Sequence, residues 1–315
     1  MSRPLSHWLL LFALVAMWGS AFMMTGIAVR GFTPATLVTV RLAIAALLLT
    51  GLVLLRRGER FPANRRFWLF SAALALAGNC VPFWLISFGQ QRIDSGLAGI
   101  LMGIMPLTTM VLAHFFVRGE RLNGTKAAGF LLGFVGLIVL IGPTALLQLR
   151  GEGTALLYQL AVLGGAVCYA INTIVARHRP PADPLVAAAG VMLMGSLVML
   201  PVGGPAAPAQ LAGAAAAPLA ALLALTVVGT AIATVVFLKL VAVAGPSFTS
   251  FINYLIPIWA LLMGMIFLGE EPEPATLLAL VLILSGIGLS ELGNRRMIRA
   301  EAYGLGGRSS GTPRT

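Results

Sequence analysis

The stretch "LALAGNCVPFWLISFGQQRIDSGLAGILMGIMP" (residues 74–106) aligns without gaps on "LTVVGTAIATVVFLKLVAVAGPSFTSFINYLIP" (residues 225–257). At this shift of 151 residues, Pro106 coincides with Pro257, and a glycine of the first stretch coincides with a glycine of the second. Identity elsewhere is low, so the repeat depends on coincident Gly, Pro and segment boundaries. The alignment predicts that the chain consists of two related halves.

The match continues beyond these stretches, where "FFVRGE" (115–120) parallels "IFLGEE" (266–271) and the shared Gly-Glu pair, 119–120 and 269–270, lies at an offset reduced to 150. We therefore divide the chain into a first repeat, residues 1–145, a second repeat, residues 153–293, and a tail, residues 294–315. We expect the tail to be disordered, because it is basic and then rich in Gly and Ser.

The composition indicates a membrane protein. Of the 315 residues, 59% are hydrophobic and only 10% are charged, whereas a soluble domain carries about 25% charged residues. The mean hydropathy is +0.96. We therefore predict an all-α polytopic membrane protein. The pI near 11.2 could suggest a nucleic-acid-binding protein, but the distribution of the basic residues favours another explanation.

Ten segments are long and apolar enough to cross a bilayer, which requires about 20 residues each. They are 8–29, 34–55, 67–89, 95–117, 125–142, 155–176, 184–202, 217–243, 247–268 and 275–293. The first segment could be read as a secretory signal peptide, with Arg3 before an apolar run and small residues near Ser20. We favour a transmembrane helix, since the apolar run continues to Val29 and the repeat requires it.

The Lys and Arg residues predict the orientation of these segments, because cytoplasmic loops carry an excess of them. Sixteen fall on the side that holds both termini, and three, Arg30, Arg92 and Arg150, fall on the other side. Both termini are therefore expected in the cytoplasm, and the basic pI reflects membrane topology. Five helices per half is an odd number, so the second half must insert upside down. Ten transmembrane helices in two inverted five-helix repeats are a common construction of secondary transporters.

With these features, the sequence resembles EamA-type members of the drug/metabolite transporter superfamily. The resemblance is carried by "WGSAF" (18–22), by Arg41 with Leu42, by "NYLIP" (253–257), and by the proline-bearing helix that ends in "GE" in both halves. It covers residues 8–293 and implies a basket of helices around a central cavity. It also implies movement of small metabolites, often outward. It does not specify the substrate.

The ninth predicted segment shows why a cavity is expected. Proline has no N–H, so Pro257 frees the carbonyl of Asn253, whose side chain lies on the same helical face. Pro106 frees the carbonyl of Met102 in the same way, and Pro82 frees that of Gly78. In lipid, such breaks are tolerated only against protein or a water-filled cavity. The alternative is that these prolines only kink packed helices.

We predict a substrate cavity near the midplane and no metal site or cofactor. Its candidate residues are Trp18, Ser20, Arg41, Asn79, Trp84, Met102, Pro106, Tyr169, Asn172, Thr230, Thr234, Asn253, Tyr254 and Pro257. The aromatic residues have an alternative role as packing or interfacial anchors. Met102 takes the place of Asn253 in the first half, so we expect the second half to supply more of the polar recognition.

Three ionisable residues within the predicted spans have alternative explanations. Arg41 could extend its charge toward the interface, brace the cavity, or hold an anionic substrate group. Lys239 lies near a helix end, where the same outward extension is expected, and His114 could titrate or pack. All ten acidic residues fall in loops, at span ends or in the tail, so the sequence does not support carboxylate-based proton coupling.

The sequence therefore predicts a permease or exporter of small polar organic metabolites such as amino acids, working by alternating access, and not an enzyme. Its expected partners are a small-molecule substrate and the lipid bilayer, without nucleic acid, and its expected location is a bacterial inner membrane.

The pairs Gly99–Gly103 and Gly129–Gly133 predict tight helix packing, within a monomer or in a weak homodimer. The competing class is a membrane-embedded enzyme acting on lipid-linked substrates, although the three histidines are scattered and no HExxH or GxSxG pattern occurs.

Overall fold

The computed structural model describes residues 4–56, 60–116, 124–141, 154–176, 178–244, 246–249 and 251–302. Within these ranges every regular element is a helix, so the predicted all-α class is confirmed. The elements up to residue 141 are α1 (Leu5–Ala28), α2 (Pro34–Leu55), α3 (Arg65–Ala75), the π-helical turn η1 (Leu76–Cys80), α4 (Val81–Gly89), α5 (Ser95–Met102), α6 (Met105–Phe116) and α7 (Gly124–Ile141).

The second part of the chain continues this all-helical arrangement. Its elements are α9 (Thr154–Ala176), α10 (Pro184–Gly203), α11 (Ala207–Gly213), α12 (Ala216–Thr226), the π-helical turn η3 (Val227–Ile232), α13 (Ala233–Ala244), α14 (Pro246–Thr249), α15 (Ile252–Met263), the π-helical turn η4 (Gly264–Leu268) and α16 (Pro274–Ala302).

Eight helical segments in the described ranges are long and apolar enough to cross a membrane, and two further apolar helices are shorter. The eight are Leu5–Ala28, Pro34–Leu55, Arg65–Gly89, Ser95–Phe116, Ala155–Ala176, Pro184–Gly203, Ala216–Val241 and Pro274–Gly293, and the two shorter ones are Gly124–Leu140 and Leu255–Leu268. The chain is therefore an integral membrane protein. Each of the ten segments coincides with one of the predicted spans.

The last helix extends further than the sequence suggested. We expected disorder from residue 294, but α16 continues through Ala302. The added stretch, "NRRMIRAEA" (294–302), contains neither Gly nor Pro and is rich in residues that favour helix. The expectation of disorder was therefore wrong for residues 294–302, and its remainder lies outside the described residues.

Several helices begin where the local sequence dictates. Thr33 precedes α2, and its Oγ1 accepts a hydrogen bond from the backbone N–H of Thr36 (3.3 Å). Asp183 precedes α10, and its Oδ1 accepts bonds from the N–H groups of Leu185 (2.8 Å) and Val186 (3.2 Å). Both helices start with proline, whose missing N–H costs nothing in the first turn.

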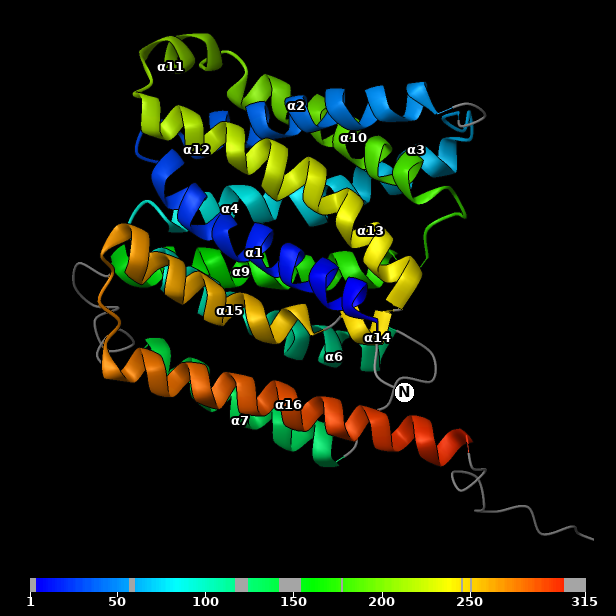
Figure 1. Cartoon of the computed structure of the whole chain (residues 1–315), viewed down its shortest axis with the longest axis vertical. Coiled ribbons are helices and arrows are strands. Elements are labelled where there is room, and N and C mark those ends of the chain that lie inside the picture. The colour runs from blue at the N-terminus through cyan, green and yellow to red at the C-terminus, as the bar shows by residue number, and fades with distance from the viewer. Residues whose placement is uncertain are drawn as a thin grey trace, which may run out of the picture.

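The long helices lie side by side in a stack (Figure 1). α2 and α10 pack together at one end of the stack, and α7 and α16 pack together at the other. Between these pairs, α1 packs against α12, α13 and α15, while α9 packs against α4, α5 and α6. α1 begins and α16 ends on the same side of the stack, at the right in Figure 1.

Small residues allow this close packing, because apolar side chains gain little by leaving lipid for another helix. A Cβ atom added at Gly286 of α16 would lie 2.5 Å from the backbone oxygen of Gly129 and 2.6 Å from the nitrogen of Gly133, both in α7. A Cβ at Gly103 would lie 3.0 Å from Ile283 of α16. The predicted close-packing glycines therefore make contacts within the chain.

Replacing Gly286 by Ala is expected to destabilise the α7–α16 pair. The new methyl group meets backbone atoms of Gly129 and Gly133, which cannot move aside as a side chain could, so we expect a loss of about 1–3 kcal/mol. The measurement is the melting temperature of the purified protein in detergent, followed by size-exclusion chromatography after heating, and the variant should melt several degrees lower.

The matched control is Gly288→Ala in the same helix, where an added Cβ has no atom within 4 Å. This variant should melt at the same temperature or higher, since Ala favours helix over Gly. Equal melting temperatures for the two variants would contradict the role given to Gly286.

Candidate functional site

A central cavity of about 520 Å³ lies between the α2–α10 and α7–α16 pairs. α1, α2, α4, α5, α6, α9, α13 and α15 and the turns η1 and η3 all contribute residues to its wall. The volume falls in the range of small-molecule sites, and the wall is mainly apolar and aromatic with a few polar groups, as is usual for such sites.

The wall is formed partly by helices whose regular hydrogen bonding is interrupted. In η1 the backbone widens to a π turn, in which the Val81 N–H bonds to the carbonyl of Leu76, directly before Pro82. Gly78 in this turn faces α9, where an added Cβ would lie 2.7 Å from the side chain of Asn172. The π turn and the glycine together bring two polar side chains, Asn79 and Asn172, to the same cavity.

The two aligned prolines occupy different local structures. α5 ends at Met102, two residues bridge the gap, and Pro106 is the second residue of α6, where its missing N–H is not needed. Pro257 instead lies inside α15. The expectation that both interrupt a helix in the same way was therefore wrong. Gly103 explains part of the difference, because its N–H bonds to the Ile100 carbonyl (2.9 Å) and tightens the end of α5.

Arg41 is the charged group of the cavity. Its side chain is only 7% exposed, and its Nε donates a hydrogen bond to Thr230 Oγ1 (2.7 Å). Its guanidinium carbon lies 3.6 Å from the centroid of the Phe83 ring, a cation–π geometry. Arg41 therefore links α2 to η3 and α4 and does not extend toward the membrane surface.

The charge of Arg41 has no carboxylate partner in the described ranges. The ion pair recorded there joins Arg56 and Asp183 instead. Among the described lining residues there is no Asp or Glu, and no hydrogen bond is recorded from the two Nη groups of Arg41. A guanidinium carries five donors, so most of them remain available on the cavity side.

Asn172 also has unused hydrogen-bonding capacity. Its Oδ1 is buried and has no hydrogen-bond partner, which costs free energy unless a ligand or water fills the place. Tyr169, three residues earlier in the same helix and so on the same face, lines the same cavity.

The cavity brings together most of the residues that the sequence singled out. These are Trp18, Arg41, Asn79, Met102, Pro106, Tyr169, Asn172, Thr230, Thr234, Asn253 and Pro257. Ser20 and Trp84 do not line it. Ser20 Oγ accepts a hydrogen bond from Trp259 Nε1 (2.9 Å), and Trp84 stacks on Phe88 with 39% of its surface exposed. The side chain of Tyr254 lies outside the described residues.

The structure adds lining residues that we did not predict, chiefly Phe22, Thr25, Phe83 and Ser87. Phe22 and Thr25 lie four and seven positions after Trp18, so helical periodicity from that residue could have found them. Phe83 takes the place we gave to Trp84 because the rotation of α4 about its axis is set by tertiary packing.

The other two ionisable residues lie away from the cavity. Lys239 of α13 is exposed, in agreement with an outward-extending amine. His114 of α6 is exposed and makes an edge contact with Phe115, so it does not lie in the packed interior.

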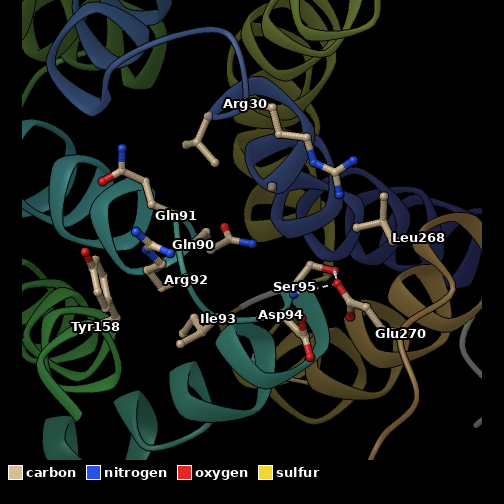
Figure 2. A pocket seen from close by; sticks show the side chains of 12 residues that line it. Arg30, Gln90, Gln91, Arg92, Ile93, Asp94, Ser95, Tyr158, Leu268 and Glu270 are labelled. Atoms are coloured by element: carbon tan, nitrogen blue, oxygen red, sulfur yellow. Dashed lines mark hydrogen bonds between the residues drawn. The ribbon is translucent and has the colours of Figure 1, made fainter. Parts of the chain in front are cut away.

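A second cavity of about 650 Å³, which we call the vestibule, is lined by the residues drawn in Figure 2, some of which adjoin residues of the central cavity along the chain. Its wall is polar and charged and is formed by Gly26, Val29, Arg30, Gln90, Gln91, Arg92, Ile93, Asp94, Ser95, Tyr158, Leu268 and Glu270. Two of the three basic residues predicted for the non-cytoplasmic side, Arg30 and Arg92, lie here.

Glu270 joins two distant parts of the chain beside the vestibule (Figure 2). Its carboxylate accepts hydrogen bonds from the Ser95 N–H (2.7 Å), the Ser95 hydroxyl (2.7 Å) and the Gly96 N–H (2.9 Å), at the start of α5. Gly269 supplies the left-handed backbone (φ 66°) that turns the chain after η4. Glu120, the counterpart of Glu270 in the predicted repeat, lies outside the described residues.

Replacing Thr230 by Val, which has the same shape, should destabilise the protein in the absence of any substrate. The change leaves Arg41 Nε and the Leu225 carbonyl without the Thr230 hydroxyl, and an unsatisfied buried group costs about 1–3 kcal/mol. The measurement is the melting temperature in detergent.

Thr226→Val is the matched control, because the Thr226 hydroxyl is buried but bonds only to its own helix, at the Leu222 carbonyl (2.7 Å). We expect a clearly smaller change in melting temperature. If both variants melt alike, the hydroxyl of Thr230 does not brace Arg41.

Comparison with known proteins supplies a family for this geometry. The EamA-like transporter family matches the chain twice, over residues 6–142 and 156–291. A probable terminal-alkyne amino-acid exporter of Streptantibioticus cattleyicolor is 28% identical, over 92% of this chain and 95% of its own. The inner membrane transporter YedA of Escherichia coli K12 is 25% identical, over 90% of each chain.

Further similarity extends to a plant protein and to a solved structure. A WAT1-related chloroplastic protein of Arabidopsis thaliana is 26% identical, over 90% of this chain and 69% of its own. A crystal structure with 20% sequence identity aligns at a TM-score of 0.60 over 94% of this chain and 99% of the other, which shows a shared fold. The name of the family and the names of the exporter and of YedA point to transporters rather than enzymes.

Proposed function

Since the chain belongs to the EamA-like transporter family of the drug/metabolite transporter superfamily, we propose that it is a secondary transporter of small polar organic metabolites, with amino acids as the leading class. The observation that carries this proposal is Arg41, a charge without a carboxylate partner in the described ranges that faces a cavity of small-molecule size. The named exporter of an amino acid among its relatives supports the same class.

The transport path is proposed to lie between two inverted five-helix repeats, residues 1–145 and 153–293, with ten membrane crossings. Support comes from the π turns η1 and η3, which begin at Leu76 and Val227, separated by the same 151 residues as the sequence repeat. The helix contacts agree, since exchanging the halves turns the α4–α9 contact into the α1–α13 contact and leaves the α2–α10 and α7–α16 pairs unchanged.

Both termini are proposed to lie in the cytoplasm, in a bacterial inner membrane. The distribution of Lys and Arg supports this orientation, as does the position of the start of α1 and the end of α16 on one side of the stack (Figure 1). An inner membrane transporter among the relatives supports the location. The vestibule then faces outward, and the direction of transport is proposed to be export.

Within the cavity, we assign the substrate carboxylate to the free Nη groups of Arg41. Asn172 Oδ1 lacks a hydrogen-bond partner and can accept a proton donor such as an ammonium group. Asn253, from the second half, lines the same wall, whereas Met102, which aligns with it in the first half, offers no hydrogen bond. Recognition is therefore asymmetric although the scaffold repeats.

Coupling is proposed to be facilitated diffusion or exchange. Alternating access, in which the cavity opens to one side at a time, accounts for transport without a titrating carboxylate in the described cavity wall. His114, the remaining candidate for proton coupling, lies on an exposed surface of α6.

Proteoliposomes that contain the purified protein should take up at least one radiolabelled amino acid from a panel of twenty, faster than empty liposomes do.

In that assay, Asn253→Ala should lower the rate by about tenfold, because a polar contact to the substrate is lost, while the melting temperature stays near that of the unchanged protein. Uptake and melting temperature are measured on the same preparation.

Ser290→Ala is the matched control, since Ser290 is a buried polar residue of α16 that does not line the cavity. It should leave uptake unchanged. Uptake of no compound in the panel would count against the proposed substrate class, and normal uptake by Asn253→Ala would remove Asn253 from the site.

Arg41→Gln should abolish the preference for a free carboxylate. For the best amino acid of the panel and its carboxamide, the unchanged protein should favour the acid by about tenfold or more, since a charge-assisted hydrogen bond contributes about 1.5–3 kcal/mol. The variant should transport the two compounds at similar rates, and Arg41→Lys should retain part of the preference.

Lys239→Gln serves as the control, because it removes a basic residue that is exposed on α13 and does not line the cavity. Its preference for the acid should be unchanged. A preference that survives in Arg41→Gln would show that another group receives the carboxylate.

A further inference from the structure

The wall between the central cavity and the vestibule is thin. On α1, Thr25 lines the central cavity and the next residue, Gly26, lines the vestibule. At the end of α4, Ser87 faces the first and Gln90 the second. These positions are at most one helical turn apart, which is about 5.4 Å along the axis. A small displacement of these helix ends would therefore join the two cavities.

Two hydrogen-bonded contacts hold this wall closed. Gln90 Nε2 donates to the backbone oxygen of Phe22 (2.8 Å), which ties the end of α4 to α1. The Glu270 carboxylate receives the two N–H groups and the hydroxyl at the start of α5, and this ties α5 to the segment that follows η4. The second contact joins residues about 175 positions apart and therefore bridges the two halves of the chain.

The bond pattern at the start of α5 is unusual because a local capping residue is present but unused. Asp94 is the N-cap residue of α5, with the extended backbone that capping requires (φ −67°, ψ 153°), yet its side chain makes no capping hydrogen bond. Glu270 occupies the N–H groups instead. If Glu270 moved away, the Asp94 carboxylate could cap the same helix from its present backbone position, by rotation of its side chain.

The closed wall also contains two unfavourable features. Gln90 is 5% exposed, and its Oε1 is buried without a hydrogen-bond partner. The pKa of Asp94 is raised above its usual value, first by burial and second by the negative charge of Glu270. Both penalties would be relieved if the segments separated, so the closed arrangement is favoured by a limited margin.

We propose that the start of α5 is the outer gate of the transport path, and that it opens when Glu270 leaves the N–H groups of Ser95 and Gly96 and Asp94 replaces it as the cap. The exchange keeps the helix end satisfied in both states, as a two-state element requires. This inference rests on the proposed function, because an outer gate belongs to a transporter, but its test needs no substrate.

The gate can be followed by the distance between two spin labels in the full chain, reconstituted in nanodiscs and measured by double electron–electron resonance. The labels are placed at Gln91→Cys and Glu273→Cys, two exposed positions on the segments that carry Asp94 and Glu270, with Cys80 and Cys168 replaced by Ala.

In the labelled protein, Glu270→Gln should raise the ratio of long to short label–label distances, which is the ratio of open to closed molecules, by about tenfold or more. The reason is that the carboxylate of Glu270 loses its charge and one of its two acceptor oxygens. Adding Asp94→Ala should then lower that ratio by about fivefold, since the open state loses its replacement cap. The matched control is Glu271→Gln, an exposed neighbouring carboxylate outside the contact, which should leave the distances unchanged.

An unchanged distance distribution in Glu270→Gln would overturn the proposal, and so would a further rise on adding Asp94→Ala. If Glu270→Gln cannot be purified in a folded form, Ser95→Ala decides the question, because it removes one of the three bonds and should raise the ratio by a smaller factor. A protein that shows these shifts but transports nothing in the amino-acid panel would retain the gate and lose only the proposed substrate class.

Discussion

Arg41 imposes the constraint on which the centre of this molecule depends. A guanidinium in the interior of a membrane protein needs polar partners and some water, and the described ranges offer it no carboxylate. It is held instead by the Thr230 hydroxyl and the face of Phe83, from two other helical segments. The rest of the guanidinium borders the central cavity, where a polar group in a membrane protein can meet water or a substrate.

Two of the π turns, η1 and η3, lie at the same cavity, while η4 contributes Leu268 to the vestibule. A π turn leaves carbonyl groups without their usual partners, and in hydrocarbon these groups require protein or water nearby. η1 and η3 both contribute residues to the cavity wall, where that requirement can be met. By contrast, α7 and α16 pack through glycines and are uninterrupted in the described ranges. Regular helices thus form the frame at the ends of the stack, and irregular helices form the site at its centre.

At the vestibule, two carboxylates are available to cap one helix. Glu270 accepts three hydrogen bonds at the start of α5 although Asp94 is available in the adjacent position. A tertiary contact has therefore displaced a local one of similar chemistry. Such a competition offers the helix end two alternative caps, which is what the proposed gate requires.

The sequence by itself determined the all-helical membrane class, the eight long apolar helices of the described ranges and the starts of α2 and α10, because apolar length and capping residues act within a few positions of the chain. Most of the residues that it singled out do line the cavity, since prolines and polar residues in apolar segments are rare enough to stand out. Only the tertiary structure decided that Arg41 bonds to Thr230, that Phe83 and not Trp84 faces the cavity, and that Glu270 caps α5. It also decided that η3 widens without a proline and that Pro106 starts a helix while Pro257 lies within one. The reason is that these features depend on the rotation of each helix about its axis and on its neighbours, which packing sets and local sequence does not.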